Sequence, residues 1–141
     1  MNHRKLFAII TLIVAVAVPV WAYQDVSEED YDAAMKAIRA TQQGVNDHLE
    51  AQNAPDVGAD GAKLVEAFEK VEAFWNAREE AVALELATKA LQAARRFQEA
   101  GGAGNFDVAG EAFGEIRSTC MPCHQQYRER TENGYRIKQG S

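Results

Sequence analysis

Five consecutive residues near the C-terminal end carry the most specific chemistry in the chain. Cys120 and Cys123 are separated by Met121 and Pro122, and His124 follows at once. Two thiols at this spacing can each form a thioether bond to one vinyl group of a haem, and the next residue then brings an imidazole to the iron. On a helix, positions i, i+3 and i+4 share a face. The pattern predicts one covalent haem c, bound by Cys120 and Cys123, with His124 as the proximal iron ligand.

Three other kinds of site use the same residue types. A thioredoxin-like dithiol also has two cysteines at this spacing, but it belongs to a fold of strands and helices, and no strand pattern is visible here. A structural zinc site needs four ligands, and beyond Cys120, Cys123 and His124 the chain after residue 22 offers only His48 among histidines and no third cysteine. A disulfide between the two cysteines leaves His124 unexplained. A dithiol or purely structural protein would be colourless when purified.

The first 22 residues have the order of a secretory signal peptide. Arg4 and Lys5 precede an apolar run over 6–18, and the segment ends on the small residue Ala22. The run is interrupted and falls short of the roughly 20 apolar residues that span a bilayer, which argues against an uncleaved membrane anchor. We therefore expect residues 1–22 to be removed and residues 23–141 to form one exported domain. Outside the reducing cytosol, a pair of free thiols would not persist.

Length and charge limit the function classes further. A chain of 141 residues is enough for one domain with a single core. The formal net charge is −6, and it becomes −8 when Arg4 and Lys5 leave with the signal peptide. Such an acidic protein repels phosphates, so nucleic acid is not an expected partner. The acidity suits a soluble protein that meets basic partners, although many soluble domains are acidic without that meaning.

The chain carries four stretches of apolar residues at helical spacing, and β-branched residues are sparse. Gln42 is the polar exception in the first stripe. Four amphipathic helices joined by short loops bury their stripes best in an antiparallel four-helix bundle, so we expect an all-α fold. The four stripes are Tyr31, Met35, Ile38, Val45 and Leu49; Leu64, Phe68, Val71 and Trp75; Leu84, Ala87, Leu91 and Ala94; and Val108 or Ala109, Ala112, Phe113, Ile116, Cys120, Cys123 and Tyr127.

Capping and turn residues predict where these helices begin and end. Ser27 has the character of an N-cap, because three acidic residues follow it. Proline and glycine gather over 52–61, which predicts a connecting loop, and a glycine cluster over 101–104 predicts a helix stop. A turn is needed near 76–80, since a helix from 62 to 100 would be about 58 Å long at 1.5 Å per residue. The last helix is expected from about Asp107, irregular near Ser118 because Pro122 lacks a backbone N–H.

The sequence resembles the class II cytochromes c, the family of cytochrome c prime. The resemblance rests on the motif over 120–128, which lies close to the C-terminus on the last of four expected helices, and on Met35-Lys36 in the first helix. It implies a covalent haem inside the bundle, with its far face against the first helix. Low-spin members place a methionine there, often followed by lysine, and transfer electrons. Five-coordinate members place an apolar residue there and bind small gases.

The resemblance implies a periplasmic one-electron carrier rather than an enzyme, with Met35 as the second axial ligand. The alternative is a five-coordinate cytochrome that binds NO or CO, in which Met35 only fills the core. Arg128 is expected near the haem propionates or in solvent, Arg39 is a weaker candidate for the same role, and His48 is a poor candidate ligand. The expected partners are periplasmic redox proteins, and the homodimer of some family members stays open.

Overall fold

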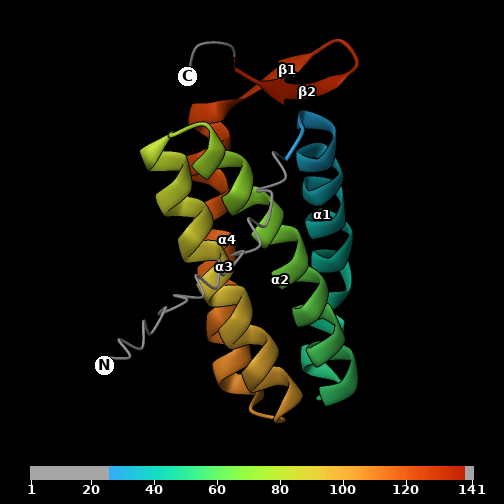
Figure 1. The fold of residues 1–141 in the computed structure, drawn as a ribbon. Coiled ribbons are helices and arrows are strands. Elements are labelled where there is room, and N and C mark those ends of the chain that lie inside the picture. Colours follow the sequence, from blue (N-terminus) through green and yellow to red (C-terminus); the bar gives the residue numbers. More distant parts are fainter. Residues whose placement is uncertain (1–25, 139–141) are drawn as a thin grey trace, which may run out of the picture.

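The computed structural model describes residues 26–138, which form four long helices and one short hairpin (Figure 1). The predicted signal peptide lies outside the described residues. The all-α prediction is confirmed for the four helices, and no helix within residues 26–138 has the length and hydropathy needed to cross a bilayer. The elements are α1 (Glu28–Glu50), α2 (Ala54–Ala77), α3 (Ala81–Gly102), α4 (Phe106–Tyr127), β1 (Arg128–Thr131) and β2 (Gly134–Ile137).

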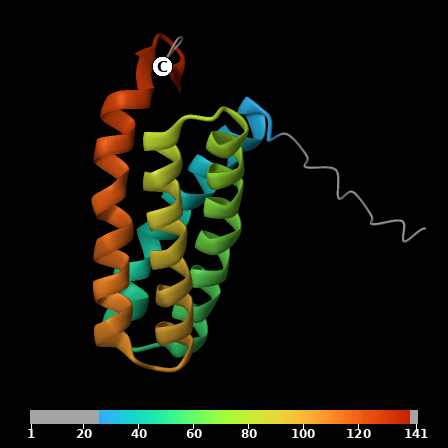
Figure 2. The ribbon, with the colours of Figure 1, turned by 60° about the vertical axis from the view of Figure 1, so that its left-hand side comes forward.

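The helices lie side by side around one core. α2 and α3 pack most extensively, α4 packs on α3, α1 packs on α2, and α1 touches α4 at only a few positions. Figures 1 and 2 show the α1–α2 and α3–α4 connections at one end of the bundle, and the α2–α3 connection at the other end with the hairpin. The aromatic residues Phe68, Trp75 and Phe113 of the predicted stripes are buried, and Phe74 and Phe97 are buried with them.

Local side-chain chemistry explains where the helices begin. Ser27 caps α1, as predicted: its hydroxyl accepts a hydrogen bond from the Asp30 N–H at 3.1 Å, and the Asp30 carboxylate accepts one from the Ser27 N–H at 3.3 Å. This reciprocal pair satisfies two backbone donors that an uncapped helix leaves without partners. Asn53 and Asn105 cap α2 and α4 without the reciprocal bond: their side-chain oxygens accept hydrogen bonds from the backbone N–H groups of Asp56 and Val108.

The predicted loop over 52–61 is wrong, because α2 begins at Ala54. Pro55 lies in the first turn, where its missing N–H has no helical partner to lose. Gly61 serves helix packing instead of a turn. A Cβ at Gly61 would lie 2.6 Å from the Cβ of Gln98 and 3.0 Å from its backbone nitrogen, so only glycine lets α2 approach α3 this closely.

The other boundaries lie near their predicted positions. α2 ends at Ala77 and α3 begins at Ala81, which confirms the turn near 76–80. Within the glycine cluster, Gly101 and Gly102 still belong to α3, and the turn follows at Gly104 with a φ of 78°. α4 begins at Phe106, and its helical assignment continues without a break through Ser118 and Pro122.

The hairpin was not predicted, since strands of four residues are too short to show an alternating pattern. β1 and β2 pair antiparallel, with Arg128 opposite Ile137 and Arg130 opposite Tyr135. The segment also satisfies the carbonyl groups that end α4. The backbone N–H of Lys138 donates to the Tyr127 carbonyl at 2.9 Å, and its ammonium group donates to the Gln125 carbonyl at 2.8 Å. The last turn of α4 is therefore held by the residues that follow it.

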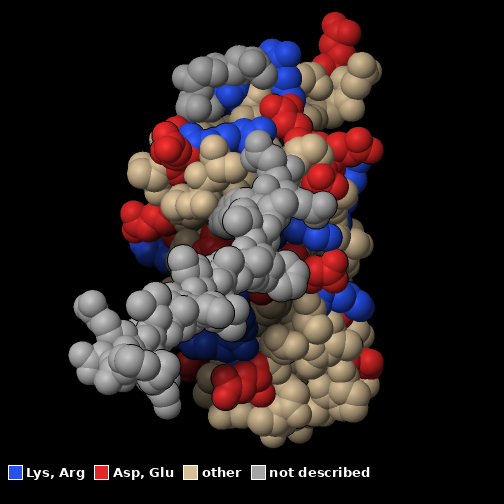
Figure 3. All heavy atoms as spheres, in the orientation of Figure 1, with Lys and Arg blue, Asp and Glu red and all other residues tan. Residues whose placement is uncertain are grey.

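Charged side chains of both signs are interspersed over the face of the bundle seen in Figure 3. Several are joined in exposed ion pairs, such as Lys70 with Glu66 within α2 and Arg95 with Glu69 between α3 and α2. Exposed pairs of this kind contribute about 0–1 kcal/mol each. Packing of the apolar stripes, rather than these pairs, stabilises the arrangement.

Candidate haem site between the first and last helices

The Cys-x-x-Cys-His motif forms the last turns of α4 and has two distinct faces. Cys120, Cys123 and His124 are all partly buried, and both thiols are free. Met121 is 58% exposed and Pro122 is also exposed. The three residues predicted to bind haem thus share the inner face of α4, as their helical spacing requires.

The surroundings of these three side chains keep them uncharged near neutral pH. Burial raises the pKa of Cys123 to about 11, and the neighbouring Cys120 adds to the shift. Burial also raises the pKa of Cys120. The pKa of His124 is lowered, chiefly by burial and then by the positive charge of Arg128. A neutral imidazole is the form of histidine that binds a metal ion.

The face of α1 opposite these residues carries Tyr31, Met35 and Gln42. Burial raises the pKa of Tyr31, and the electrostatic effect of Cys123 raises it further. At the other end of the stripe, the Gln42 side chain lies close enough to Cys120 to oppose the burial effect on the pKa of that thiol. Two residues of α1 thus lie near the two cysteines, and Met35 lies between them on the same helical face, partly buried against the core.

The space between α1 and α4 has a polar feature that the protein alone does not satisfy. The amide nitrogen Nε2 of Gln42 is buried and has no hydrogen-bond partner among the described residues, although the Cys120 sulfur lies nearby. A buried N–H without a partner costs about 1–3 kcal/mol. Because α1 and α4 also touch so little, the residues fit a bound group between these helices better than they fit direct helix–helix packing.

A cluster of aromatic rings closes one end of this region. The Trp75 ring is 1% exposed and lies 5.7 Å from the Tyr31 ring and 4.9 Å from the Tyr127 ring, measured between centroids. The Tyr127 hydroxyl donates a hydrogen bond of 2.9 Å to the carboxylate of Glu80, which directly precedes α3. The end of α4 that carries His124 is therefore tied to the α2–α3 connection.

Arg128 lies beside the motif but outside the core. It is the first residue of β1, and its backbone N–H donates to the His124 carbonyl. Its exposed guanidinium lies 4.2 Å from the ring centroid of Tyr135. The same positive charge adds to the lowering of the His124 pKa and opposes the rise of the Tyr31 pKa, so Arg128 lies near both walls of the site. Arg39, the weaker candidate, is exposed on α1.

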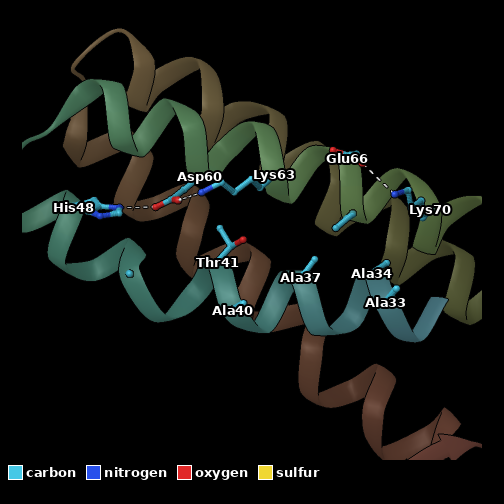
Figure 4. Close-up of a pocket in the computed structure, with 12 residues that line it drawn as sticks. Ala33, Ala34, Ala37, Ala40, Thr41, His48, Asp60, Lys63, Glu66 and Lys70 are labelled. Carbon is cyan, nitrogen blue, oxygen red and sulfur yellow. Dashed lines mark hydrogen bonds and ion pairs between the residues drawn. The ribbon is translucent and has the colours of Figure 1, made fainter. Parts of the chain in front are cut away.

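His48 belongs to a different part of the molecule. Its Nδ1 forms a 2.7 Å hydrogen bond with Asp60, whose side chain is buried in α2. Figure 4 shows this pair at one end of a groove between α1 and α2, with small side chains such as Ala37 along α1. Neither the cysteines nor His124 nor Met35 lines this groove.

Sequence reasoning missed Tyr31 and Gln42 as neighbours of the cysteines, and Trp75 as the ring between Tyr31 and Tyr127. Gln42 had a visible signal, because it interrupts an apolar stripe. Within residues 26–138, no three His, Cys, Asp or Glu side chains gather as the ligands of a metal ion would. Comparisons of the chain with models of known protein families, with curated proteins and with solved structures found no match.

Proposed function

We propose that the protein is a c-type cytochrome that carries one electron through a single covalent haem in an antiparallel four-helix bundle, as its resemblance to the class II cytochromes c implies. The observation that supports this most is the common, half-buried face of Cys120, Cys123 and His124 on α4, turned toward a helix that α4 hardly touches. In this proposal the two cysteines hold the haem by thioether bonds. The haem supplies the one-electron couple of its iron.

The residues of the chain have separate tasks in this proposal. His124 is uncharged and its turn is held by the hairpin, so its imidazole is available to the iron in a fixed position. Met35, on the facing helix, is the proposed second axial ligand. Methionine in that role raises the reduction potential relative to a second histidine. With both axial positions filled by the protein, no acid, base or nucleophile is required, and the exchange partners are other exported redox proteins.

The optical spectrum of the protein, expressed with a haem-attachment system, tests this proposal. We expect a red protein with a low-spin ferrous spectrum and a weak sulfur-to-iron band in the ferric state. Met35→Ala should abolish that band, whereas Met121→Ala should retain it, because Met121 is 58% exposed on the outer face of α4. Both variants truncate a methionine. Met35 packs against the core on α1, whereas Met121 lies outside the site.

Three results would count against parts of the proposal. A colourless protein would overturn the haem assignment and favour a dithiol or structural role. A high-spin spectrum that Met35→Ala leaves unchanged, and that shifts on addition of carbon monoxide, would overturn the carrier mechanism in favour of gas binding. A mature protein that retains residues 1–22, as measured by mass, would overturn export by a cleaved signal peptide.

A further inference from the structure

The hairpin that follows α4 differs in charge from the rest of the molecule. Residues 128–138 carry four basic and two acidic side chains, whereas residues 26–127 carry nine basic and 18 acidic ones. The hairpin thus has a formal charge of +2 on a body of −9. Figures 1 and 2 show it projecting beyond the ends of the helices. The acidity of the whole chain predicts basic partners, but this surface suits the opposite kind.

One face of the hairpin gathers exposed side chains that are suited to contact a partner. Directly opposite residues of an antiparallel pair point to the same side of the sheet, so Arg130 shares its side with Tyr135, and Arg128 with Ile137. Ile137 packs against the core and fixes this face to the bundle. The other three residues are exposed, and the Arg128 guanidinium lies 4.2 Å from the Tyr135 ring centroid. Arginine and tyrosine are enriched at the energetic centres of protein interfaces.

The two arginines on this face have no carboxylate partner. Neither Arg128 nor Arg130 forms an ion pair with a residue of the described range 26–138, whereas Arg136, on the other face of the hairpin, is paired with Glu129 at 2.5 Å. A guanidinium group binds a carboxylate through two parallel hydrogen bonds. The face therefore offers two unused carboxylate sites beside an aromatic ring.

The acidic groups around the hairpin limit how such a partner can approach. The same end of the bundle holds the acidic first turn of α1, and Glu79 and Glu80 in the α2–α3 connection. A partner carboxylate is attracted only where the guanidinium groups are within about a Debye length, which is about 10 Å at 0.1 M salt. Attraction at one small face and repulsion by the acidic body favour a single orientation of the complex.

We propose that the face formed by Arg128, Arg130 and Tyr135, the docking face, binds an exported redox protein that presents a cluster of carboxylates. The redox role of this partner rests on the proposed function. The backbone N–H of Arg128 donates to the His124 carbonyl, so a partner bound here lies beside the turn that carries the proposed iron ligand. The hairpin is held in place before binding, because Lys138 bonds to the end of α4, and docking then costs little conformational freedom.

The test compares Arg130→Gln with Arg95→Gln, which removes the same charge from α3. Arg95 lies 14 residues after the start of α3 at Ala81, about 21 Å along the axis, which is about two Debye lengths at 0.1 M salt. The binding of a fluorescent oligoglutamate peptide to the purified protein is measured by anisotropy at about that salt concentration. We expect Arg130→Gln to weaken binding several-fold, Arg128→Gln with Arg130→Gln to abolish it, and Arg95→Gln to leave it unchanged.

Electron exchange supplies a second measurement. Hexacyanoferrate(III), an anion, and tris(phenanthroline)cobalt(III), a cation, each take one electron from the ferrous, haem-loaded protein. Arg130→Gln should slow the reaction with the anion and speed the reaction with the cation, because it removes a positive charge from the docking face. Arg95→Gln should change neither rate. A variant that merely lost stability would not shift the two rates in opposite directions.

Three results would overturn the inference. A wild-type protein that binds no oligoglutamate has no such surface. Equal effects of Arg130→Gln and Arg95→Gln would assign the binding to net charge. A dimer that Arg130→Gln dissociates, measured by sedimentation, would assign the face to a second copy of the chain. If the chain takes up no haem, the proposed function fails, and the redox role of the partner fails with it even where the peptide binds as expected.

Discussion

Replacing Gly61 by alanine tests the closest approach in the bundle. The added Cβ would lie 2.6 Å from the Cβ of Gln98 and 3.0 Å from its backbone nitrogen, and it would come closer still to its Cα. Backbone atoms cannot rotate away as the end of a side chain can, so α2 and α3 would have to separate. These two helices form the most extensive contact in the molecule.

The expected loss follows from two opposing effects. Overpacking of a well-packed interior costs about 1–3 kcal/mol, and a clash with backbone belongs at the upper end, about 3 kcal/mol. Alanine returns about 1 kcal/mol through its better helix propensity. The free energy of unfolding should therefore fall by about 2 kcal/mol. At about 4 °C for each kcal/mol in a domain of this size, the melting temperature should fall by about 8 °C.

Gly114→Ala is the matched control for the same substitution. A Cβ at Gly114 meets nothing within 4 Å, and the residue is exposed in the interior of α4. Only the propensity effect then applies, so this variant should gain about 1 kcal/mol. Denaturant unfolding followed by circular dichroism measures both. If Gly61→Ala is as stable as Gly114→Ala, the explanation of why α2 contains glycine is wrong.

Three further predictions concern single side chains. Tyr127→Phe removes the hydrogen bond that the hydroxyl donates to Glu80 and the one that it accepts from the Gln126 amide, and should cost about 1.5 kcal/mol in chemical denaturation, whereas Tyr135→Phe, at a residue that is 57% exposed, should cost nothing measurable. The hydrogen bond to Asp60 raises the pKa of His48 in the folded chain above its ordinary value of 6.5, so its stabilisation is complete below pH 6.5 and is lost as the pH rises through the raised pKa. The melting temperature of the wild type should therefore exceed that of His48→Gln most at acidic pH, and a difference that does not vary with pH would contradict this. Ser27→Ala removes the cap of α1 and should cost about 1 kcal/mol in the same denaturant assay; equal stability would mean that the first turn of α1 frays in the wild type.

Hydrophobic periodicity was a sound guide to the helices, because each stripe has one face to bury. The limit on helix length added the turn near 76–80, and the glycine cluster over 101–104 added the stop before α4. Periodicity itself predicted the buried aromatic residues. It failed over 52–61, where proline and glycine were interpreted as loop residues. Proline also occurs in the first turn of helices, and glycine at close contacts between helices. Whether such residues form a loop or a helix therefore depends on the partner helix, which the local sequence does not show.

The candidate site, too, could be predicted from the sequence only in part. The common face of Cys120, Cys123 and His124 follows from spacing within one helix. The approach of Tyr31 and Gln42 to those cysteines depends on how α1 is registered against the rest of the bundle, which no local pattern specifies. The hairpin was missed for a related reason: strands of four residues gain their stability from pairing and from closing α4, not from their own sequence.

α1 is the least extensively packed of the four helices. Its contacts are mainly with α2, and the α1 residues along their shared groove include Ala33, Ala37 and Gly44, which have a methyl group or no side chain and so bury little apolar area. α1 is therefore the helix expected to open first, while α2, α3 and α4 keep their more extensive contacts. We expect its amide hydrogens to exchange with solvent sooner than those of α3. If the group that Cys120 binds is bulky, a local opening of α1 is the route that would leave the other three helices folded.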